Sequence, residues 1–237
     1  MNYPNSKLNS ALSLRGFTLI ELLTVIAIIS VLAAILIPAI QGVRERSFVT
    51  KTTSNLRHLQ QANLLYASDN NGFFVDPVPV ARDASGNPTG RDWNSVWFDN
   101  DRFIQYLSLD ERTTDWEEGF PEIARSGIPE LTFGDNQRYS IGMNIGDRQQ
   151  WGGSIIAFRQ SEITNPSQSF AFSDATDFWV KINRADAWES DEEKTGMGMA
   201  YRNDGKAAVV HFDGSVSMVT KEESVGNREL WIPDLDN

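Results

Sequence analysis

The sequence predicts an α+β fold in which one long N-terminal helix packs on an antiparallel β-sheet head. Two patterns predict the helix: an apolar run of membrane-spanning length at residues 17–40, and an amphipathic helical pattern that continues it through residues 41–68. A third pattern predicts the sheet, because residues 207–220 form two β-rich runs around Asp213-Gly214, as in a hairpin. The globular head is therefore expected to span residues 69–237.

The apolar run reads FTLIELLTVIAIISVLAAILIPAI and contains one ionisable residue, Glu21. Its length of about 24 residues is enough to cross a hydrocarbon core of roughly 30 Å as a helix. A charged side chain inside the bilayer costs about 2.5–3.5 kcal/mol, so Glu21 needs a functional reason and a partner. A secretory signal peptide is excluded, because its apolar core is shorter and ends at a small-residue cleavage site. An ordinary signal anchor that tolerates a glutamate near the interface is the alternative.

Residues 15–21, Arg-Gly-Phe-Thr-Leu-Ile-Glu, together with the run that follows them, resemble the class III signal of type IV pilins and type II secretion pseudopilins. The resemblance implies a pilin-like fold. In that family a prepilin peptidase cuts after the glycine and methylates the new amino terminus. Carried over by position, residues 1–16 are a leader peptide, the cut falls between Gly16 and Phe17, and Phe17 becomes N-methylated. Glu21 then lies one helical turn from the new amine, where the family uses it for methylation and subunit assembly.

Physical chemistry supports a pairing between Glu21 and the Phe17 amine. An acid inside the bilayer is stabilised by a cation, and cleavage would create one at Phe17. In a stack of subunits, Glu21 of one chain would meet the Phe17 amine of its neighbour and set the register. The partners that the resemblance implies are prepilin peptidase, identical or related pilin subunits, the inner-membrane assembly machinery, and membrane lipid before assembly.

The resemblance also implies a location. The protein would cross the bacterial inner membrane once, with its leader in the cytoplasm and its head in the periplasm, and would then enter a pilus, a pseudopilus or the cell surface. Charge alone does not favour this orientation under the positive-inside rule. The leader carries Lys7 and Arg15, whereas the far flank carries Arg44, Arg46 and Lys51.

Composition excludes several functions. The chain of 237 residues has a formal net charge of −11, and loss of the leader would remove Lys7 and Arg15 but no acid. This acidic balance argues against a nucleic-acid partner, which needs a basic face. The chain has no Cys, so a cysteine nucleophile is excluded and a typical zinc cluster is not expected. The two histidines, His58 and His211, are expected to be structural, and we predict no enzymatic activity.

The amphipathic pattern beyond residue 41 predicts the helix face that packs against the head. Its members repeat at three- and four-residue steps: Phe48, Thr52, Leu56, Leu59, Asn63 and Tyr66. Arg57, Gln60 and Gln61 lie off this stripe. The run Asp69-Asn70-Asn71-Gly72 supplies residues that end a helix.

Weaker patterns divide the rest of the head. Short helices are expected near Phe103–Leu107 and Trp116–Ala124. Strands are expected at Arg138–Met143, Ser154–Phe158 and Ser169–Ser173.

The segment around Asp213-Gly214 resembles a C-terminal motif of a large prepilin-type subfamily, in which a His is followed by nine residues and Asp-Gly. Asp213 and Gly214 match, but the position ten residues before Asp213 is Asn203. The only His of the segment, His211, lies inside the strand. Asp213-Gly214 also suits a type I′ turn, whose two central residues both have positive φ. The sequence does not show which residue performs the role of the motif His.

Calcium is the one cofactor that the sequence suggests. Pseudopilins of the family often bind Ca²⁺ in a head loop, and this ion prefers clustered oxygen ligands. The candidate ligands are Asp69, Asn71 and Asp76, or Asp99 and Asp101, or Asp174 and Asp177. None has the spacing of an EF-hand, and turn chemistry explains most such residues.

Two classes of function remain open. The first is a structural subunit that polymerises through its helix into a pilus or a secretion pseudopilus. The second is a membrane-anchored module that binds a surface, for example a glycan, and uses the prepilin route for export. Its binding face would consist of exposed tryptophans: Trp93, Trp97, Trp116, Trp151, Trp179 and Trp188. The alternative interpretation is that these side chains pack in the core. The sequence does not distinguish a pilus, a secretion pseudopilus and a DNA-uptake fibre, or a major from a minor subunit.

Overall fold

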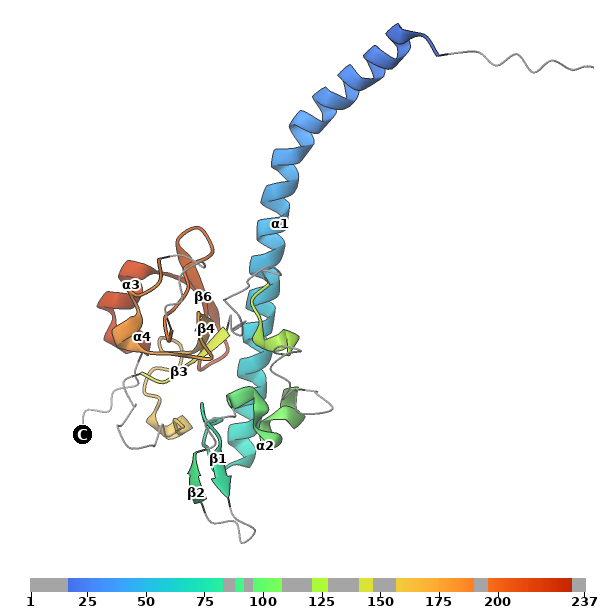
Figure 1. Ribbon diagram of the computed structural model, residues 1–237. Helices are drawn as coiled ribbons and strands as arrows, with labels where there is room; N and C mark the ends of the chain where they lie inside the picture. The colour runs from blue at the N-terminus through green and yellow to red at the C-terminus, as the bar shows by residue number, and fades with distance from the viewer. Residues whose placement is uncertain are drawn as a thin grey trace, which may run out of the picture. The chain divides into compact units, whose positions relative to one another are not determined.

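The computed structural model describes residues 17–82, 88–91, 96–107, 121–127, 141–146, 157–189 and 196–231 (Figure 1). The chain divides into two compact units, residues 1–44 and 45–237. Helix α1 (Leu19–Asp69) contributes to both, and each unit is described by itself. The expected leader, residues 1–16, lies outside the described residues.

The first unit consists of the N-terminal part of α1, which continues through Pro38 without a break. Its large apolar side chains, from Leu19 to Val43, are between 46% and 83% exposed. By length and composition, α1 is the one helix among the described residues that could cross a membrane. An apolar surface with no cover from its own chain is one that lipid or neighbouring helices would bury.

The described residues of the second unit form two β-sheets. A five-stranded sheet has the order β5-β3-β4-β6-β7, antiparallel except for the parallel pair of β3 and β5. Its strands are β3 (Ile141–Asn144), β4 (Phe170–Asp174), β5 (Trp179–Val180), β6 (Lys206–His211) and β7 (Val216–Thr220). The smaller sheet pairs β1 (Val80–Arg82) with β2 (Pro88–Arg91).

Apart from α1, the helices in the described residues of this unit are short. The α-helices are α2 (Asp101–Ile104), α3 (Lys221–Gly226) and α4 (Arg228–Trp231). The 3-10 helices are η1 (Trp97–Asp99), η2 (Gln105–Leu107), η3 (Glu122–Ala124), η5 (Gln160–Glu162) and η6 (Ile182–Arg184). The predicted short helix near residues 103–107 is confirmed, and η3 lies at the end of the second one, whose residues 116–120 are outside the described ranges.

The second half of α1 packs against one face of the five-stranded sheet. The predicted stripe is confirmed: Thr52, Leu56, Leu59, Asn63 and Tyr66 are buried, and Phe48 is half-buried. Of these, Leu56, Leu59 and Tyr66 share a core with sheet residues Ile141, Phe172, Ala208 and Val210. This burial of apolar area is what holds the helix on the head.

One prediction about this helix face is wrong. Gln60, which the pattern places off the stripe, has no exposed surface. Its Nε2 donates a hydrogen bond of 2.7 Å to the backbone oxygen of Phe212. Because the Gln60 amide donor and the Phe212 carbonyl are hydrogen-bonded to each other, burying them costs little free energy. The buried face of α1 is therefore wider than the apolar residues alone indicate.

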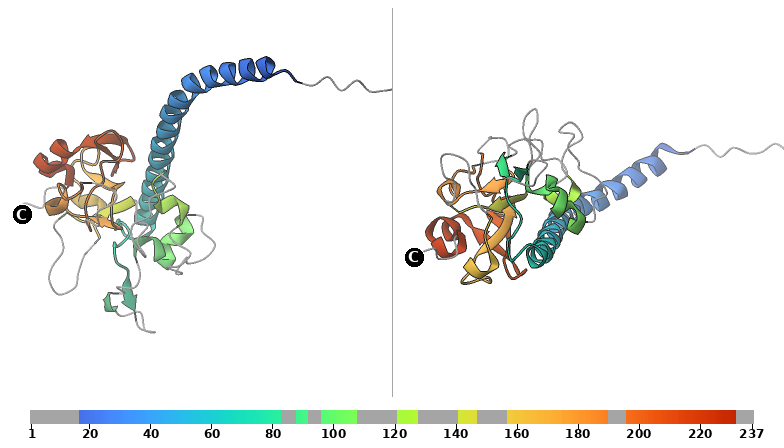
Figure 2. Two further views of the ribbon diagram at one scale, coloured as in Figure 1. Left: turned by 45° about the horizontal axis from the view of Figure 1, so that its top comes forward. Right: turned by 90° about the horizontal axis from the view of Figure 1, so that it is seen from below.

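The opposite face of the sheet is covered by α3 and α4, so the sheet lies between two helical layers (Figure 2). Trp231 and Leu230 pack there against Phe170, Val209 and Val219. The Trp231 and Phe170 rings meet edge to face, with centroids 4.9 Å apart. Asn144 fixes this layer, because its Nδ2 donates to the backbone oxygens of Trp231 and Phe170 at 2.6 and 2.8 Å.

The predicted end of α1 is confirmed. The helix ends at Asp69, and the next residues adopt left-handed backbone conformations, with φ of 55° at Asn71 and 80° at Gly72. The Gly72 N–H donates to the Ala67 oxygen at 2.8 Å. This is the way in which Asn and Gly end helices.

The strand predictions hold in part. Strands β3 and β4 occupy the predicted segments 138–143 and 169–173, although residues 138–140 lie outside the described ranges. Residues 154–156 of the predicted strand Ser154–Phe158 lie outside the described ranges, and the prediction is wrong for Ala157 and Phe158, which are not in a strand. The neighbouring Arg159 forms an isolated bridge with Phe73 instead.

The two strands of the C-terminal hairpin are confirmed, but its turn type is wrong. Gly214 has a φ of 89°, whereas Asp213 does not have a positive φ. The Gly214 N–H donates to the His211 oxygen at 2.9 Å, and the His211 N–H donates to the Ser215 oxygen at 2.8 Å. Five residues separate the last paired residues of the hairpin, Val210 and Val216, too many for a two-residue type I′ turn.

A type I′ turn occurs instead at another Asp-Gly pair, Asp204-Gly205, which lies just before β6. Asp204 and Gly205 have φ of 53° and 72°. The flanking Asn203 and Lys206 exchange two backbone hydrogen bonds of 3.0 and 3.1 Å. This geometry is the one that Asp-Gly favours in tight turns.

Candidate functional site

Helix α1 begins with a capping box formed by Thr18 and Glu21. The backbone N–H and the hydroxyl of Thr18 both donate to Glu21 Oε2, at 2.9 and 2.8 Å. The Glu21 N–H donates in return to Thr18 Oγ1 at 3.2 Å. This reciprocal arrangement satisfies backbone groups that the first turn of a helix leaves unpaired. It also places a negative charge at the positive end of the helix dipole.

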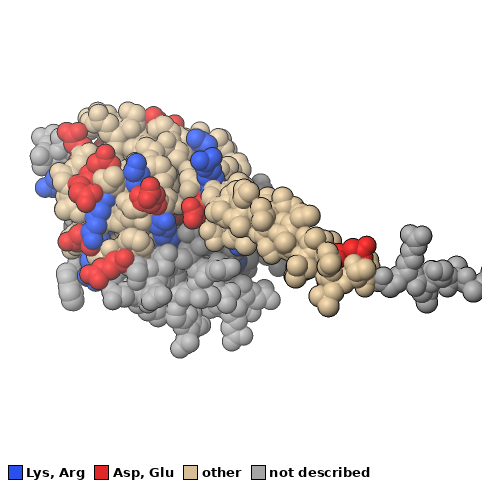
Figure 3. Space-filling view, turned by 90° about the horizontal axis from the view of Figure 1, so that it is seen from above, with Lys and Arg blue, Asp and Glu red and all other residues tan. Residues whose placement is uncertain are grey.

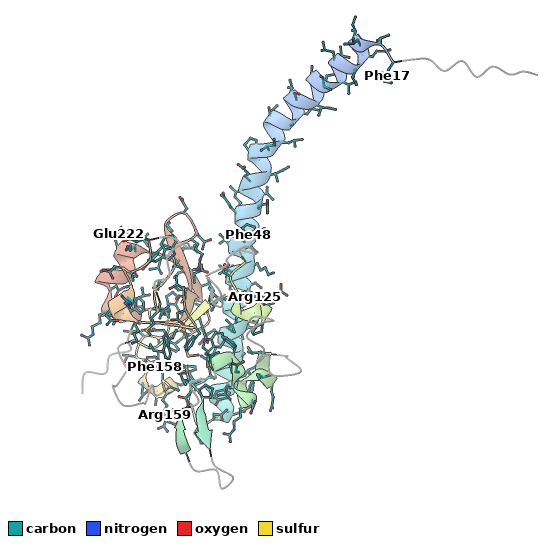
Figure 4. The ribbon with its side chains drawn as sticks, viewed as in Figure 1. Phe17, Phe48, Arg125, Phe158, Arg159 and Glu222 are labelled. Carbon is teal, nitrogen blue, oxygen red and sulfur yellow. The ribbon has the colours of Figure 1, made fainter. Side chains whose placement is uncertain are left out.

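The surroundings of this capping box are apolar. Phe17 is 79% exposed, and the side chains of Leu19, Ile20 and Leu22 are exposed as well (Figure 4). Figure 3 shows a single acidic spot at the tip of a helix that is otherwise uncharged on this face. Within the described part of the chain no cation pairs with Glu21, and its Oε1 accepts no hydrogen bond. The carboxylate therefore has one oxygen available for a partner from outside the chain.

The predicted cleavage point lies just before this site. Gly16 is outside the described residues, and Phe17 and Thr18 precede the first helical residue, Leu19. The bond on the amino side of Phe17 is therefore not held inside the helix. A cut at this bond would place the new amine at Phe17, directly before the capping box.

The residues in the first two groups of calcium candidates have roles in the local structure. Asp69 Oδ2 accepts a hydrogen bond of 2.7 Å from the Tyr106 hydroxyl. Asp76 Oδ1 accepts one of 3.0 Å from the Ala157 N–H. Asn71 occupies the left-handed position after α1. Asp99 is buried in η1, and Asp101 starts α2.

The last two calcium candidates, Asp174 and Asp177, also lie in the head. Asp174 is 1% exposed and binds Asn203, as described below. Asp177 Oδ1 accepts a hydrogen bond of 2.8 Å from the Phe178 N–H. Over the described ranges, no three His, Cys, Asp or Glu side chains gather as metal ligands would.

The tryptophans do not form the predicted binding face where the structure describes them. Trp97 is completely buried and donates through Nε1 to the Phe178 oxygen at 2.7 Å. Trp179 is 5% exposed, and Trp188 is partly buried against Tyr201. The core interpretation is therefore correct for Trp97 and Trp179. Outside the described residues lie Trp93, Trp116 and Trp151.

The two histidines occupy different environments. His58 is exposed on α1. His211 is buried in β6, where its Nε2 lies 2.8 Å from Ser217 Oγ on the neighbouring strand. Burial lowers the pKa of His211. A neutral imidazole bonded to a serine across a hairpin fits the structural role expected of it.

Sequence reasoning missed a segment that holds α1 on the head. Residues 121–127 lie along the helix, where Asn55 Nδ2 donates to the backbone oxygens of Glu122 and Arg125 at 3.0 and 2.9 Å. The Gly127 N–H donates to Thr52 Oγ1 at 2.7 Å. Thr52, a polar member of the predicted stripe, was the available signal, because a buried polar side chain needs a partner.

Known proteins resemble this chain over part of its length. Residues 14–37 match the family model described as the prokaryotic N-terminal methylation motif. The type IV wide pilus major component PilA4 of Thermus thermophilus is 48% identical over 59 residues, which are 25% of this chain and 45% of that protein. Type II secretion system core protein G of Pectobacterium carotovorum is 38% identical over 69 residues, 29% of this chain and 44% of that protein.

The same core protein G from Pseudomonas aeruginosa is 28% identical over 101 residues, which are 40% of this chain and 66% of that protein. The chain thus spans less than two thirds of the length of each of these relatives. No solved structure matches the chain. The match to the family model covers the start of the chain and the first part of α1.

Proposed function

We propose that this chain, a pilin- or pseudopilin-like protein by its methylation motif and its relatives, is a structural subunit of a type IV pilus or a type II secretion pseudopilus. One observation carries the proposal: an exposed apolar helix begins with a capped glutamate, within the residues that match the methylation motif. A polymer built through such helices would bury this apolar surface and supply the missing partner of Glu21.

The proposed maturation is a cut between Gly16 and Phe17 by prepilin peptidase, followed by methylation of the Phe17 amine. The cut removes Lys7 and Arg15 and leaves Phe17 as the first residue. The helix is then ready to pack, because no polar leader remains ahead of it.

In the assembled fibre, Glu21 of one subunit pairs with the Phe17 amine of the next. The Thr18 bonds occupy Oε2 of the carboxylate, so Oε1 is the atom that faces the neighbour's amine. An ion pair in an apolar medium is strong and depends on position, so it fixes the register of each incoming subunit. Apolar helix packing supplies the affinity.

The proposed location follows the same path. The unassembled subunit crosses the bacterial inner membrane once, with its leader in the cytoplasm and its head in the periplasm. Its partners there are lipid, the peptidase, the inner-membrane assembly machinery and other pilin subunits. We propose no enzymatic activity and no nucleic-acid partner for it. The membrane-anchored binding module remains the alternative, weakened by the burial of Trp97 and Trp179.

The first test is the intact mass and N-terminal sequence of the membrane-extracted protein, from cells with and without prepilin peptidase. We expect a chain that starts at N-methylated Phe17 only where the peptidase is present. A Gly16→Val variant is the matched control, because it should keep its leader in both strains. A wild-type chain that starts at Met1 in both strains would contradict the proposal and favour the binding module.

A further inference from the structure

Asn203, which stands where the C-terminal motif has a His, binds a buried carboxylate. Its Nδ2 donates to Asp174 Oδ2 at 2.9 Å. Asp174 is the last residue of β4 and is 1% exposed. The Ala208 N–H donates to the same Oδ2 at 3.2 Å, and Arg202 Nη1 lies 3.8 Å from Oδ1.

All three of these groups come from one short stretch, the tight turn and the start of β6. Arg202 Nη2 also donates to the Ala175 oxygen at 2.8 Å, and the Ala200 N–H donates to the Asp174 oxygen at 3.0 Å. The turn that contains Asn203 is thereby tied to the end of β4. An ionised carboxylate at this depth is tolerated only if donors surround it, and breaking a buried network is costly.

We propose that position 203 is the side-chain donor which holds the type I′ turn on Asp174, and that an imidazole in place of Asn203 would make the same contact. The residue at this motif position is then a structural partner of a buried acid rather than a metal ligand or a catalytic group. Asn203 makes the contact without carrying a charge. A His there would make it as an imidazolium, because a buried carboxylate favours the charged form of its partner.

Other charged groups face the same position. Arg202 and Asp204 flank it in the chain, and Lys206 lies opposite it in the turn. Across a cleft of about 980 Å³, α1 presents Glu45 and Arg46. Of these groups, Asp174 is the one that the Asn203 side chain contacts. Asp174 therefore determines that the pKa of a His at position 203 would be raised.

The test uses the full-length chain in detergent and three variants, Asn203→His, Asn203→Leu and Asn227→His. Asn227 is exposed after α3, so its variant adds a His with no carboxylate contact and controls for the substitution itself. Melting temperatures are measured by circular dichroism from pH 5.5 to 8.5. We expect Asn203→Leu to melt about 5 °C below the wild type at every pH, since it leaves Asp174 short of a donor.

Asn203→His should regain stability as the solution is acidified. Its imidazole pKa would be raised in the folded state by Asp174, so the stabilisation is complete below the ordinary value of about 6.5 and is lost as pH rises through the raised value. Its melting temperature relative to the wild type should therefore be higher at pH 5.5 than at pH 8.5. Asn227→His should follow the wild type. Equal melting of the His and Leu variants at all pH values would overturn the proposal, as would a Leu variant as stable as the wild type.

A measurement on the wild-type chain covers the case in which neither variant at position 203 folds. The side-chain amide protons of Asn203 should exchange with solvent more slowly than those of Asn227, as followed by NMR. Equal exchange rates would overturn the proposal, because they would show that the Asn203–Asp174 contact does not protect the amide.

Discussion

Gly127 lies so close to helix α1 that a Cβ atom at this position would be 2.2 Å from the backbone oxygen of Phe48. The same added atom would be 2.9 Å from Lys51 Cβ. Neither contact is the end of a flexible side chain, so the helix or the 121–127 segment would have to move. The close approach is what allows the Gly127 N–H to reach Thr52.

Gly127→Ala should therefore destabilise the head by about 1–3 kcal/mol, the usual cost of overpacking. Denaturant unfolding of the full-length chain in detergent measures it. Gly226→Ala is the matched control, because nothing lies within 4 Å of a Cβ built there and alanine suits the end of α3. A Gly127→Ala variant as stable as Gly226→Ala would contradict the close packing of this segment.

Glu21→Ala should leave membrane insertion intact and reduce fibre assembly. Alanine removes a charge from the bilayer, so insertion does not suffer, whereas the Phe17 amine of the next subunit loses its partner. A loss of roughly 2.5–3.5 kcal/mol corresponds to about a hundredfold fewer assembled subunits. Sheared fibres and membrane fractions are quantified side by side, with Glu45→Ala as the control acid on the same helix.

Glu21→Gln separates the charge of this residue from its capping role. Glutamine can accept the Thr18 hydrogen bonds, because the capping box uses Glu or Gln, but it cannot pair with an amine as an ion. We expect assembly by Glu21→Gln to be as poor as by Glu21→Ala. Normal assembly by the Gln variant would show that capping, and not the ion pair, is what assembly needs.

Asp177 should make the stability of the head depend on pH. Burial raises its pKa from the ordinary value of 3.8 to about 6, against the hydrogen bonds from the Phe178 and Met197 backbone. A raised pKa means that the folded chain holds the proton more tightly than the unfolded chain. The contribution of Asp177 to stability is therefore present below about pH 3.8 and is lost as pH rises through about 6.

The free energy of unfolding should accordingly contain a component that falls by about 1–3 kcal/mol toward neutral pH. Chemical unfolding in detergent at several values between pH 4.5 and 7.5 measures this slope. Asp177→Asn should lose that component, and the matched variant Asp204→Asn should keep the wild-type slope. An unchanged slope in Asp177→Asn would assign the pH dependence to other groups.

Gln60→Leu tests the buried amide of α1. Leucine fills a similar volume but leaves the Phe212 oxygen without its donor, so we expect a loss of about 1–3 kcal/mol. Gln61→Leu is the control, because Gln61 is exposed one residue further along the same helix. Equal stability of the two variants would mean that the hydrogen bond contributes nothing measurable.

The parts of the fold that sequence predicts well are those with a repeating pattern. The stripe from Phe48 to Tyr66 predicts the buried face of α1, because apolar spacing reports helix geometry directly. Gln60 escapes this reasoning, since its burial depends on a carbonyl 152 residues away in the chain. We did not predict the capping box at Thr18 and Glu21, although Thr-x-x-Glu is a local signal of one.

The turns show why local patterns are not enough. Asp204-Gly205 and Asp213-Gly214 are identical pairs, yet only the first has positive φ at both residues. The difference comes from the pairing of the flanking strands, which sets the loop length. Helices α3 and α4 are missed for a related reason. They are six and four residues long, too short for a periodic signal, and they form where Trp231 docks on the sheet.

The covering of the sheet by α3 and α4 has a consequence for biogenesis. The face that carries Phe170, Val209 and Val219 has no cover from α3 and α4 until the chain has been synthesised through Trp231. A head that emerges amino terminus first is then an aggregation-prone chain with a finished hairpin and no cover for it. The interval in which this apolar face lacks its cover therefore lies between the synthesis of Thr220 and the synthesis of Trp231.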